Sequence, residues 1–370
     1  MIIYKPEIYT NDNNTIFSAR IHVDHTGHYP ETLWIKIPSL YECNLTKSSN
    51  PFITSLFLLA SRFGEDINIK GNVSPRLIWG IQQYLQLFKN WYPNLYKISK
   101  IDAEFYEKKI NSRNDIASSF SGGVDSFYTI LRNNPTKPCP LPISYAFFIH
   151  GFDIPLNDPN NYWKIFKQYK SVLKQLDIEL IPIATNIRDF LFEMTWEEVF
   201  GGPLAGIAFC FDNLFQYYLV PSAYDSEFLM KQGTDSRLVP LLATESTSLL
   251  LDAGGVSRTE KTSLIAKNPN TYNNLRVCWE TIDGVSNCGN CEKCIRTMTE
   301  LELLGKLDNY STFKSPWSAK KIRRIRITTG FKRASWKHIL SVSKRMNRLD
   351  IQFSILCSFL LSKIHPKHKK

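Results

Sequence analysis

A run of small and polar residues lies between an apolar segment and a segment with helical spacing. Ser121-Gly122-Gly123-Val124-Asp125-Ser126 follows the apolar residues from Ile116 to Phe120. The first backbone N–H groups of a helix are unpaired and attract anions, and glycines let a phosphate approach the backbone closely. The serine hydroxyls add donors, and Asp125 suits the Mg²⁺ that accompanies phosphates. The run predicts a loop that binds pyrophosphate groups at the end of a buried strand.

The loop lacks the Gly-x-x-x-x-Gly-Lys pattern of P-loop enzymes. It resembles the signature of the PP-loop (N-type) ATP pyrophosphatases, which include GMP synthetase, NAD synthetase, asparagine synthetase and tRNA-thiolating enzymes. In that family ATP adenylates a substrate oxygen, pyrophosphate leaves, and a nucleophile then displaces AMP. The resemblance implies an open, parallel, Rossmann-like sheet of the adenine nucleotide alpha hydrolase type. It also implies that MgATP is held by Ser121, Gly122, Gly123, Val124, Asp125 and Ser126.

A second motif lies downstream of the loop. Ser257-Arg258-Thr259-Glu260-Lys261 is similar to a helix start of the same family, in which a lysine reaches the phosphates. The resemblance gives that role to Lys261 and a weaker one to Arg258, so Asp125, Lys261 and Arg258 are the catalytic candidates. Here Glu260 precedes the lysine, which departs from the family order. The alternative is a surface helix with Ser257 as its N-cap.

Two other loops follow segments that are predicted to be strands. They are His150-Gly151-Phe152-Asp153 and the loop from Gly233 to Arg237. In open α/β sheets, ligands bind beyond the carboxyl ends of the strands. We therefore expect His150 and Asp153 to border the adenosine or the acceptor, and the second loop to close the pocket. For each loop, merely capping the sheet is the alternative.

Four of the eight cysteines fall in one short stretch, at Cys278, Cys288, Cys291 and Cys294. Thiolates two residues apart converge on a metal through a tight turn, and a closed four-cysteine site is typical of structural Zn²⁺. An iron–sulfur cluster is the alternative. The stretch from Asn287 to Arg296 is similar to the C-terminal C-G-x-C-x-x-C-x-x-R motif of 7-cyano-7-deazaguanine synthases, whose upstream cysteine completes a zinc site. This narrower resemblance extends from Ile116 to Leu304.

The segments around these motifs alternate between strand and helix. Ile143 to Ile149 and Ile178 to Ala184 are apolar runs typical of buried strands, and Tyr162 to Leu176 has helical spacing between them. A further apolar helix is predicted from Pro203 to Tyr218, and Phe215 to Pro221 runs on towards a fourth strand. Alternation of this kind predicts an α/β fold with an open parallel sheet.

The first hundred residues have a different pattern. Thr15 to Val23 and Leu33 to Ile37 are rich in β-branched and aromatic residues, which predicts a small antiparallel sheet, and Ser74-Pro75 predicts the start of a helix. We therefore expect three units. These are an N-terminal α+β domain (1–105), an ATP pyrophosphatase domain (106–310) with the zinc knuckle at 278–294, and a basic helical extension (311–370).

The positive charge of the chain is concentrated at one end. Of the net charge of +11, residues 314–370 contribute +15, with 16 Lys and Arg residues against Asp350 alone, and the remainder carries −4. Such a segment suits a nucleic acid or a membrane surface, or is simply a solvated extension. The residues from Ile339 to Ile364 are apolar on more than one side, so peripheral membrane attachment and packing on the enzyme body are both open. No secretory signal or spanning stretch is evident, so we expect a cytoplasmic protein.

These motifs predict a ligase that uses ATP, Mg²⁺ and Zn²⁺. MgATP would adenylate a carboxylate or an amide of a small molecule or a macromolecule, and ammonia or an amine would then form an amide, a nitrile or a conjugate. One alternative is sulfur transfer to RNA, with Cys139 and Cys210 as the candidate thiols. Another is a non-catalytic nucleotide-binding module that recruits a partner. The sequence leaves the oligomeric state open, a homodimer included.

Overall fold

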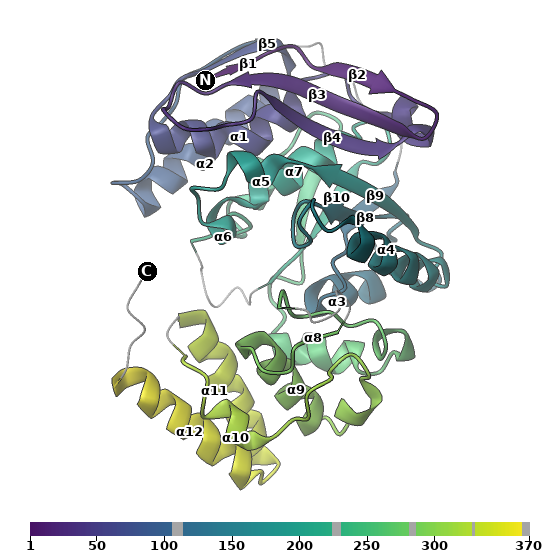
Figure 1. Ribbon diagram of the computed structural model, residues 1–370, viewed down its shortest axis with the longest axis vertical. Helices are drawn as coiled ribbons and strands as arrows, with labels where there is room; N and C mark the ends of the chain where they lie inside the picture. Colours follow the sequence, from purple (N-terminus) through teal and green to yellow (C-terminus); the bar gives the residue numbers. More distant parts are fainter. Residues whose placement is uncertain (106–113, 224–230, 281–285, 328–329, 365–370) are drawn as a thin grey trace.

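The computed structural model describes residues 1–105, 114–223, 231–280, 286–327 and 330–364. Within these residues, eleven strands form one mixed sheet that is mostly parallel (Figure 1). The order is β11 (Ser248–Asp252), β10 (Tyr217–Pro221), β7 (Ile116–Ser119), β8 (Tyr145–His150), β9 (Glu179–Thr185), β4 (Thr32–Pro38), β3 (Asn14–His22), β1 (Ile2–Ile3), β5 (Ile67–Val73) and β6 (Ile101–Phe105), with β2 (Glu7–Thr10) paired to β3. The predicted α/β class with a largely parallel sheet is confirmed.

The five strands from β11 to β9 are parallel to one another. Between them run α3 (Val124–Arg132) and α4 (Pro159–Lys174), where Asp158 caps α4 by accepting a hydrogen bond from Asn161 N. The next long helix, α7 (Gly201–Phe209), ends well before the predicted Tyr218. Tertiary contacts end the helix, because Tyr217 and the residues after it pair with β7 and β11 instead of continuing it.

The N-terminal strands extend this sheet, which corrects the expectation of a separate small antiparallel sheet. β3 and β4 do pair antiparallel, but β4 also pairs with β9, through Ile35 opposite Thr185. Helix α1 (Asn50–Phe63) packs on α7 so closely that a Cβ on Gly206 would lie 2.7 Å from Pro51 O. A single apolar core therefore runs from Met1 to Leu249. Strand periodicity alone does not reveal which edge a strand will join.

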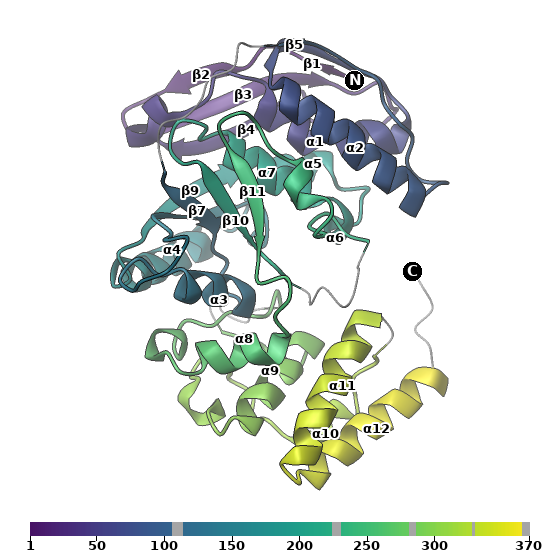
Figure 2. The same ribbon diagram turned by 180° about the vertical axis from the view of Figure 1, so that it is seen from behind.

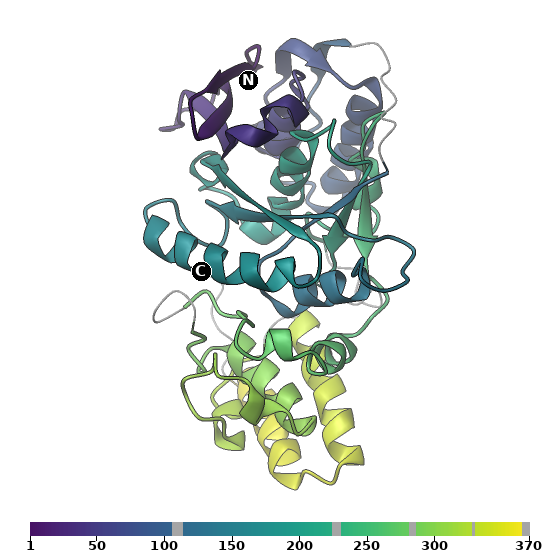
Figure 3. The same cartoon turned by 90° about the vertical axis from the view of Figure 1, so that its right-hand side faces the viewer.

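The remaining helices complete the two ends of the molecule. Figures 1 and 3 show the N-terminal strands and helices at one end, the parallel strands in the middle and α8–α12 at the other end. Their bounds are α2 (Pro75–Trp91), α5 (Ile187–Phe190), α6 (Trp196–Val199), α8 (Arg258–Ile265), α9 (Glu292–Leu303), α10 (Ala319–Ile322), α11 (Gly330–Arg345) and α12 (Leu349–Ile364), with 3₁₀ turns at Ser39–Asn44, Val239–Leu241, Pro269–Thr271 and Leu307–Asn309.

The basic C-terminal segment folds into a helical hairpin rather than one helix. Asn347, with a φ of 53°, turns the chain between α11 and α12. Trp336 donates a hydrogen bond to Glu292 Oε1 at 3.0 Å, and Arg348 pairs with Glu302 at 3.0 Å, so the hairpin is attached to α9. Of the helices described here, none has both the length and the apolar character needed to cross a bilayer.

A buried carboxylate at the α1–α7 junction makes stability depend on pH. Burial raises the pKa of Asp212 from 3.8 to about 7, although side-chain hydrogen bonds from Thr247, Thr46 and Asn50 oppose the rise. At pH values between 3.8 and about 7, Asp212 is deprotonated in the unfolded state and protonated in the folded state. This group therefore lowers the free energy of unfolding as pH rises across that window, by up to about 4 kcal/mol.

Asp212→Asn should remove this contribution, so that the variant gains stability over wild type as pH rises. Urea unfolding of both proteins at several pH values between about 4 and 8 measures the difference. Asp189→Asn, at an exposed position, is the control and should leave the pH dependence unchanged. Parallel curves for wild type and Asp212→Asn would contradict the assignment.

Candidate functional site

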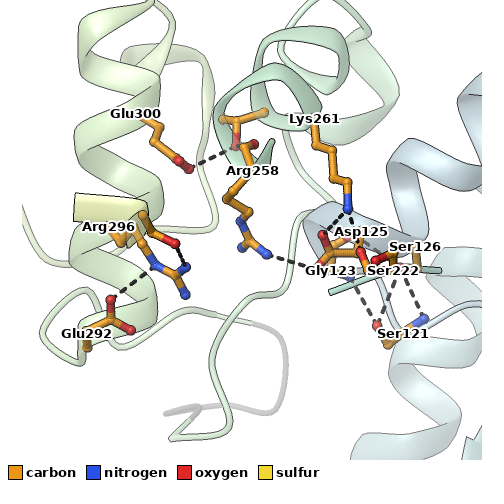
Figure 4. Close-up of polar contacts among 12 residues, drawn as sticks. Ser121, Gly123, Asp125, Ser126, Ser222, Arg258, Lys261, Glu292, Arg296 and Glu300 are labelled. Carbon is orange, nitrogen blue, oxygen red and sulfur yellow. Dashed lines mark hydrogen bonds and ion pairs between the residues drawn. The ribbon is translucent and has the colours of Figure 1, made fainter. Parts of the chain in front are cut away.

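The Ser121–Ser126 loop lies at the carboxyl edge of the sheet, in the middle of its parallel part. It follows β7, whose neighbours β10 and β8 run in the same direction. Ser126 donates to Gly123 O at 3.1 Å, and Ser121 N donates to Ser126 Oγ at 3.3 Å (Figure 4). Gly123 is the N-cap of α3. Having no side chain, it leaves the first N–H groups of the helix to an incoming anion.

Gly122 holds the loop in a shape that other residues resist. Its φ is +75°, and a Cβ placed there would lie 1.7 Å from Tyr169 Oη. Gly122→Ala should therefore distort the loop, at a cost on the order of 1–3 kcal/mol in stability. If the loop binds MgATP, as the sequence predicts, the same change should abolish that binding. Calorimetric titration with MgATP and thermal unfolding measure the two effects. Gly255→Ala, where a Cβ meets nothing within 4 Å, should behave as wild type; equal behaviour of the two variants would contradict this role.

Asp125 is the meeting point of two cations from α8. Arg258 Nη1 lies 2.8 Å from Asp125 Oδ2, and Lys261 Nζ lies 3.5 Å from Oδ1 and donates to Ser222 O at 2.5 Å (Figure 4). Burial alone would raise the pKa of Asp125, but Arg258 and Lys261 outweigh it and hold the pKa below its ordinary value. The three catalytic candidates are thus brought together as a partly buried ionic cluster.

The start of α8 accounts for the unexpected order of its residues. Ser257 accepts a hydrogen bond from Glu260 N, and Glu260 accepts one from Ser257 N at 2.9 Å, which makes a reciprocal capping box. The capping box fixes the first turn of α8, and Lys261 points inward from that turn. The N-cap motif therefore also sets the position of the lysine. Burial lowers the pKa of Lys261, an effect that the neighbouring Asp125 opposes.

Three further cations come from the segment around the cysteines, and the sequence analysis did not assign them. Arg276, Lys293 and Arg296 line a cavity of about 210 Å³ together with the loop and Arg258. Lys293 Nζ lies 3.8 Å from the centre of the Trp279 ring. Arg276 is 7% exposed, and its Nε has no hydrogen-bond partner among the described residues. Such an excess of buried donors suits a polyanion.

A carboxylate behind the cavity links the two cation-bearing helices. Glu300 on α9 accepts hydrogen bonds from Thr259 at 3.1 Å and from Thr262 at 2.9 Å, both on α8. Burial raises its pKa, while Arg258 and Arg296 act in the opposite direction. The position of Arg258 therefore depends on the packing of α9, and through α9 on the cysteine segment.

A larger, mainly apolar cavity of about 760 Å³ adjoins the loop. Asp153 lines both cavities. That it borders a ligand stays a prediction. His150 lines neither, because its ring stacks on Tyr162 at 4.3 Å and its Nε2 lies 2.8 Å from Pro155 O. The loop starting at Gly233 touches α2, where Arg237 lies over the Trp91 ring at 4.6 Å.

The four clustered cysteines form a candidate metal centre. Their Sγ atoms all lie within 4.8 Å of one another, with Cys278–Cys291 at 3.6 Å and Cys288–Cys294 at 3.8 Å. Zn–S bonds of about 2.3 Å in a tetrahedron require Sγ atoms about 3.8 Å apart. The group could therefore hold one metal ion such as zinc. Around a four-iron cluster each thiolate binds a different iron, so the sulfurs would stand further apart.

The candidate metal centre and the smaller cavity are neighbours, since Cys278 lines that cavity. The sequence signal for the three missed cations was their position among or within two residues of the cysteines. No family model, curated protein or solved structure matches this chain. The case for a function therefore rests on the motifs and on the geometry of the site.

Proposed function

We propose that this chain is an AMP-forming ligase that binds MgATP at the Ser121–Ser126 loop and cleaves it between the α- and β-phosphates. The observation that carries the proposal is the convergence of Asp125, Arg258 and Lys261 at the N-terminus of α3, beside a cavity lined by three more cations. Charge that develops on the departing pyrophosphate would meet preformed donors, which is electrostatic and positional catalysis.

In this proposal Asp125 would also hold Mg²⁺, which neutralises phosphate charge when bound. Both of its oxygens face cations from α8. Binding MgATP would exchange these contacts, so that Arg258 and Lys261 turn from the carboxylate to phosphate oxygens. Each charged group of the cluster would then still face a group of opposite charge.

The larger cavity is the proposed place for the adenosine and the acceptor. A carboxylate oxygen of the acceptor attacks the α-phosphorus, the new O–P bond forms and the bond to pyrophosphate breaks. Ammonia or an amine then attacks the acyl carbon, loses a proton, and AMP departs with the oxygen. The mainly apolar lining would protect the adenylate from water.

Positions of the other cysteines argue against sulfur transfer. Cys210 is fully buried at the end of α7, and burial raises the pKa of its thiol far above the ordinary value. Cys139 lies 3.5 Å from Asn134 O. Neither residue lines either cavity. A persulfide would need a free reactive thiol close to the loop. The cysteine that lines the smaller cavity, Cys278, belongs to the four-cysteine group that could hold a metal, so amide or conjugate formation fits this site better.

The test is acceptor-dependent release of AMP and pyrophosphate. The protein is incubated with MgATP, ammonium and a panel of carboxylates, 7-carboxy-7-deazaguanine included, beside the Asp125→Ala variant. We expect AMP and pyrophosphate in equal amounts with at least one acceptor, and none with the variant. Sulfur incorporation into RNA in place of amide formation would reject the amide assignment.

A further inference from the structure

Helix α12 is packed with its polar side facing the protein. Ser354 and Ser358 are fully buried and Ser362 is 7% exposed. Each has a partner in the neighbouring segment: Arg323 Nε donates to Ser354, Ser358 donates to Ile325 O, and Ser362 accepts from Ile327 N. The hydrogen-bonding needs of the inner face are therefore met within the chain, alongside buried Ile351 and Ile355.

The outer side of the same helix is apolar. Leu349, Phe353, Leu356 and Leu360 are 73%, 58%, 48% and 59% exposed, and their spacing of four, three and four residues places them in one row. Figures 1 and 2 show α12 at the end of the molecule remote from the N-terminal sheet. Single exposed leucines are ordinary, but a continuous row on one helix marks a binding surface.

Cations border this row on both sides. The Arg323 guanidinium lies 4.9 Å from the centre of the Phe353 ring, and that of Arg333 lies 6.0 Å from the Phe359 ring. Lys363 is exposed one turn beyond the last leucine of the row. The whole segment from 314 to 370 carries a net charge of +15. The surface therefore combines an apolar strip with a strongly positive border.

We propose that the outer face of α12 docks on an anionic lipid surface, with the row of Leu349, Phe353, Leu356 and Leu360 inserted at the level of the headgroups. A helix with apolar residues on one side and Lys and Arg beside them binds such interfaces. A second copy of this face would bring two positive borders together, and a nucleic acid offers nothing apolar to the leucines. An anionic bilayer satisfies both features.

Vesicle co-sedimentation of the full chain tests this surface. The vesicles are phosphatidylcholine alone, or phosphatidylcholine with phosphatidylglycerol. We expect wild type to sediment with the anionic vesicles only, and less so as salt is raised. Leu356→Ser combined with Leu360→Ser, which leaves the charge unchanged, should weaken binding by about tenfold or more. Leu40→Ser, at a leucine 68% exposed in the N-terminal part, should bind as wild type.

Each other result overturns the proposal. Wild type that stays in the supernatant with both kinds of vesicle shows that the face does not bind lipid. Equal sedimentation with neutral vesicles removes the role of charge. Light scattering could instead find wild type to be a dimer and the double serine variant a monomer, with neither protein sedimenting with vesicles. The row on α12 would then be an interface between two copies of the chain. Thermal unfolding must be alike in all variants, because none of these side chains is buried.

Discussion

Replacing Lys261 by methionine is expected to reduce the rate of AMP formation by about 10²–10³-fold, the usual effect of losing one donor to a charged transition state. Methionine keeps the packing of the side chain, which is almost wholly buried, and removes only the ammonium group. Asp125 retains Arg258 at 2.8 Å, so its partly buried carboxylate keeps a counter-charge. The variant should therefore fold while losing activity, as circular dichroism and single-turnover AMP release would measure.

Lys267→Met is the matched control, because this lysine lies just beyond the same helix and is exposed. Its rate should equal that of wild type. Lys261→Arg should recover part of the activity, since a cation returns to the site with a different shape. Full activity in Lys261→Met would show that the lysine only stabilises the fold, and would remove it from the proposed mechanism.

Loss of the metal centre is expected to disable nucleotide binding as well as to destabilise the protein. Cys288→Ser with Cys291→Ser removes two of the four thiolates, and a structural zinc contributes on the order of 10 kcal/mol to the folding of its surroundings. Arg276, Lys293 and Arg296 lie in that segment and line the smaller cavity. MgATP affinity should fall by at least about a hundredfold, since each charge-assisted bond contributes about 1.5–3 kcal/mol.

Elemental analysis, thermal unfolding and MgATP titration of the same preparations measure this prediction. We expect one zinc per chain in wild type and none in the double variant. Cys139→Ser and Cys357→Ser, which alter cysteines outside the cluster, should keep both zinc and affinity. A double variant that lacks metal yet binds MgATP like wild type would separate the knuckle from the nucleotide site.

The features that could be predicted from the sequence depend on residues that are close together in the chain. The strand, the glycine-containing loop and α3 are consecutive, so their chemistry is visible in six residues. The N-cap at Ser74 is likewise present in the structure, where its side chain accepts from Leu77 N. The two-residue gaps between Cys288, Cys291 and Cys294 predict that these three thiols converge, and Cys278, separated from Cys288 by nine residues, was the candidate for the fourth ligand.

Long-range packing explains the rest. β4 pairs with β9, which is far away in the sequence. The hydrophobic periodicity of a strand does not identify its pairing partner, so we expected the N-terminal strands to form their own sheet. His150 ends a strand beside the site, but its ring packs against Tyr162 instead of entering a cavity. Arg276 lies beside the loop, where its backbone N donates to Gly122 O at 2.8 Å. Such contacts arise from the folded chain as a whole.

The identity of the cleaved bond tests the central claim most directly. Phosphorus NMR of the products formed from MgATP by wild-type protein, with ammonium and the best acceptor of the panel, distinguishes the two cleavage sites. We expect AMP and pyrophosphate in equal amounts, without ADP, and about 10²–10³-fold slower formation of both in Lys261→Met. ADP and inorganic phosphate as the products would contradict it, because the loop would then be transferring the γ-phosphate.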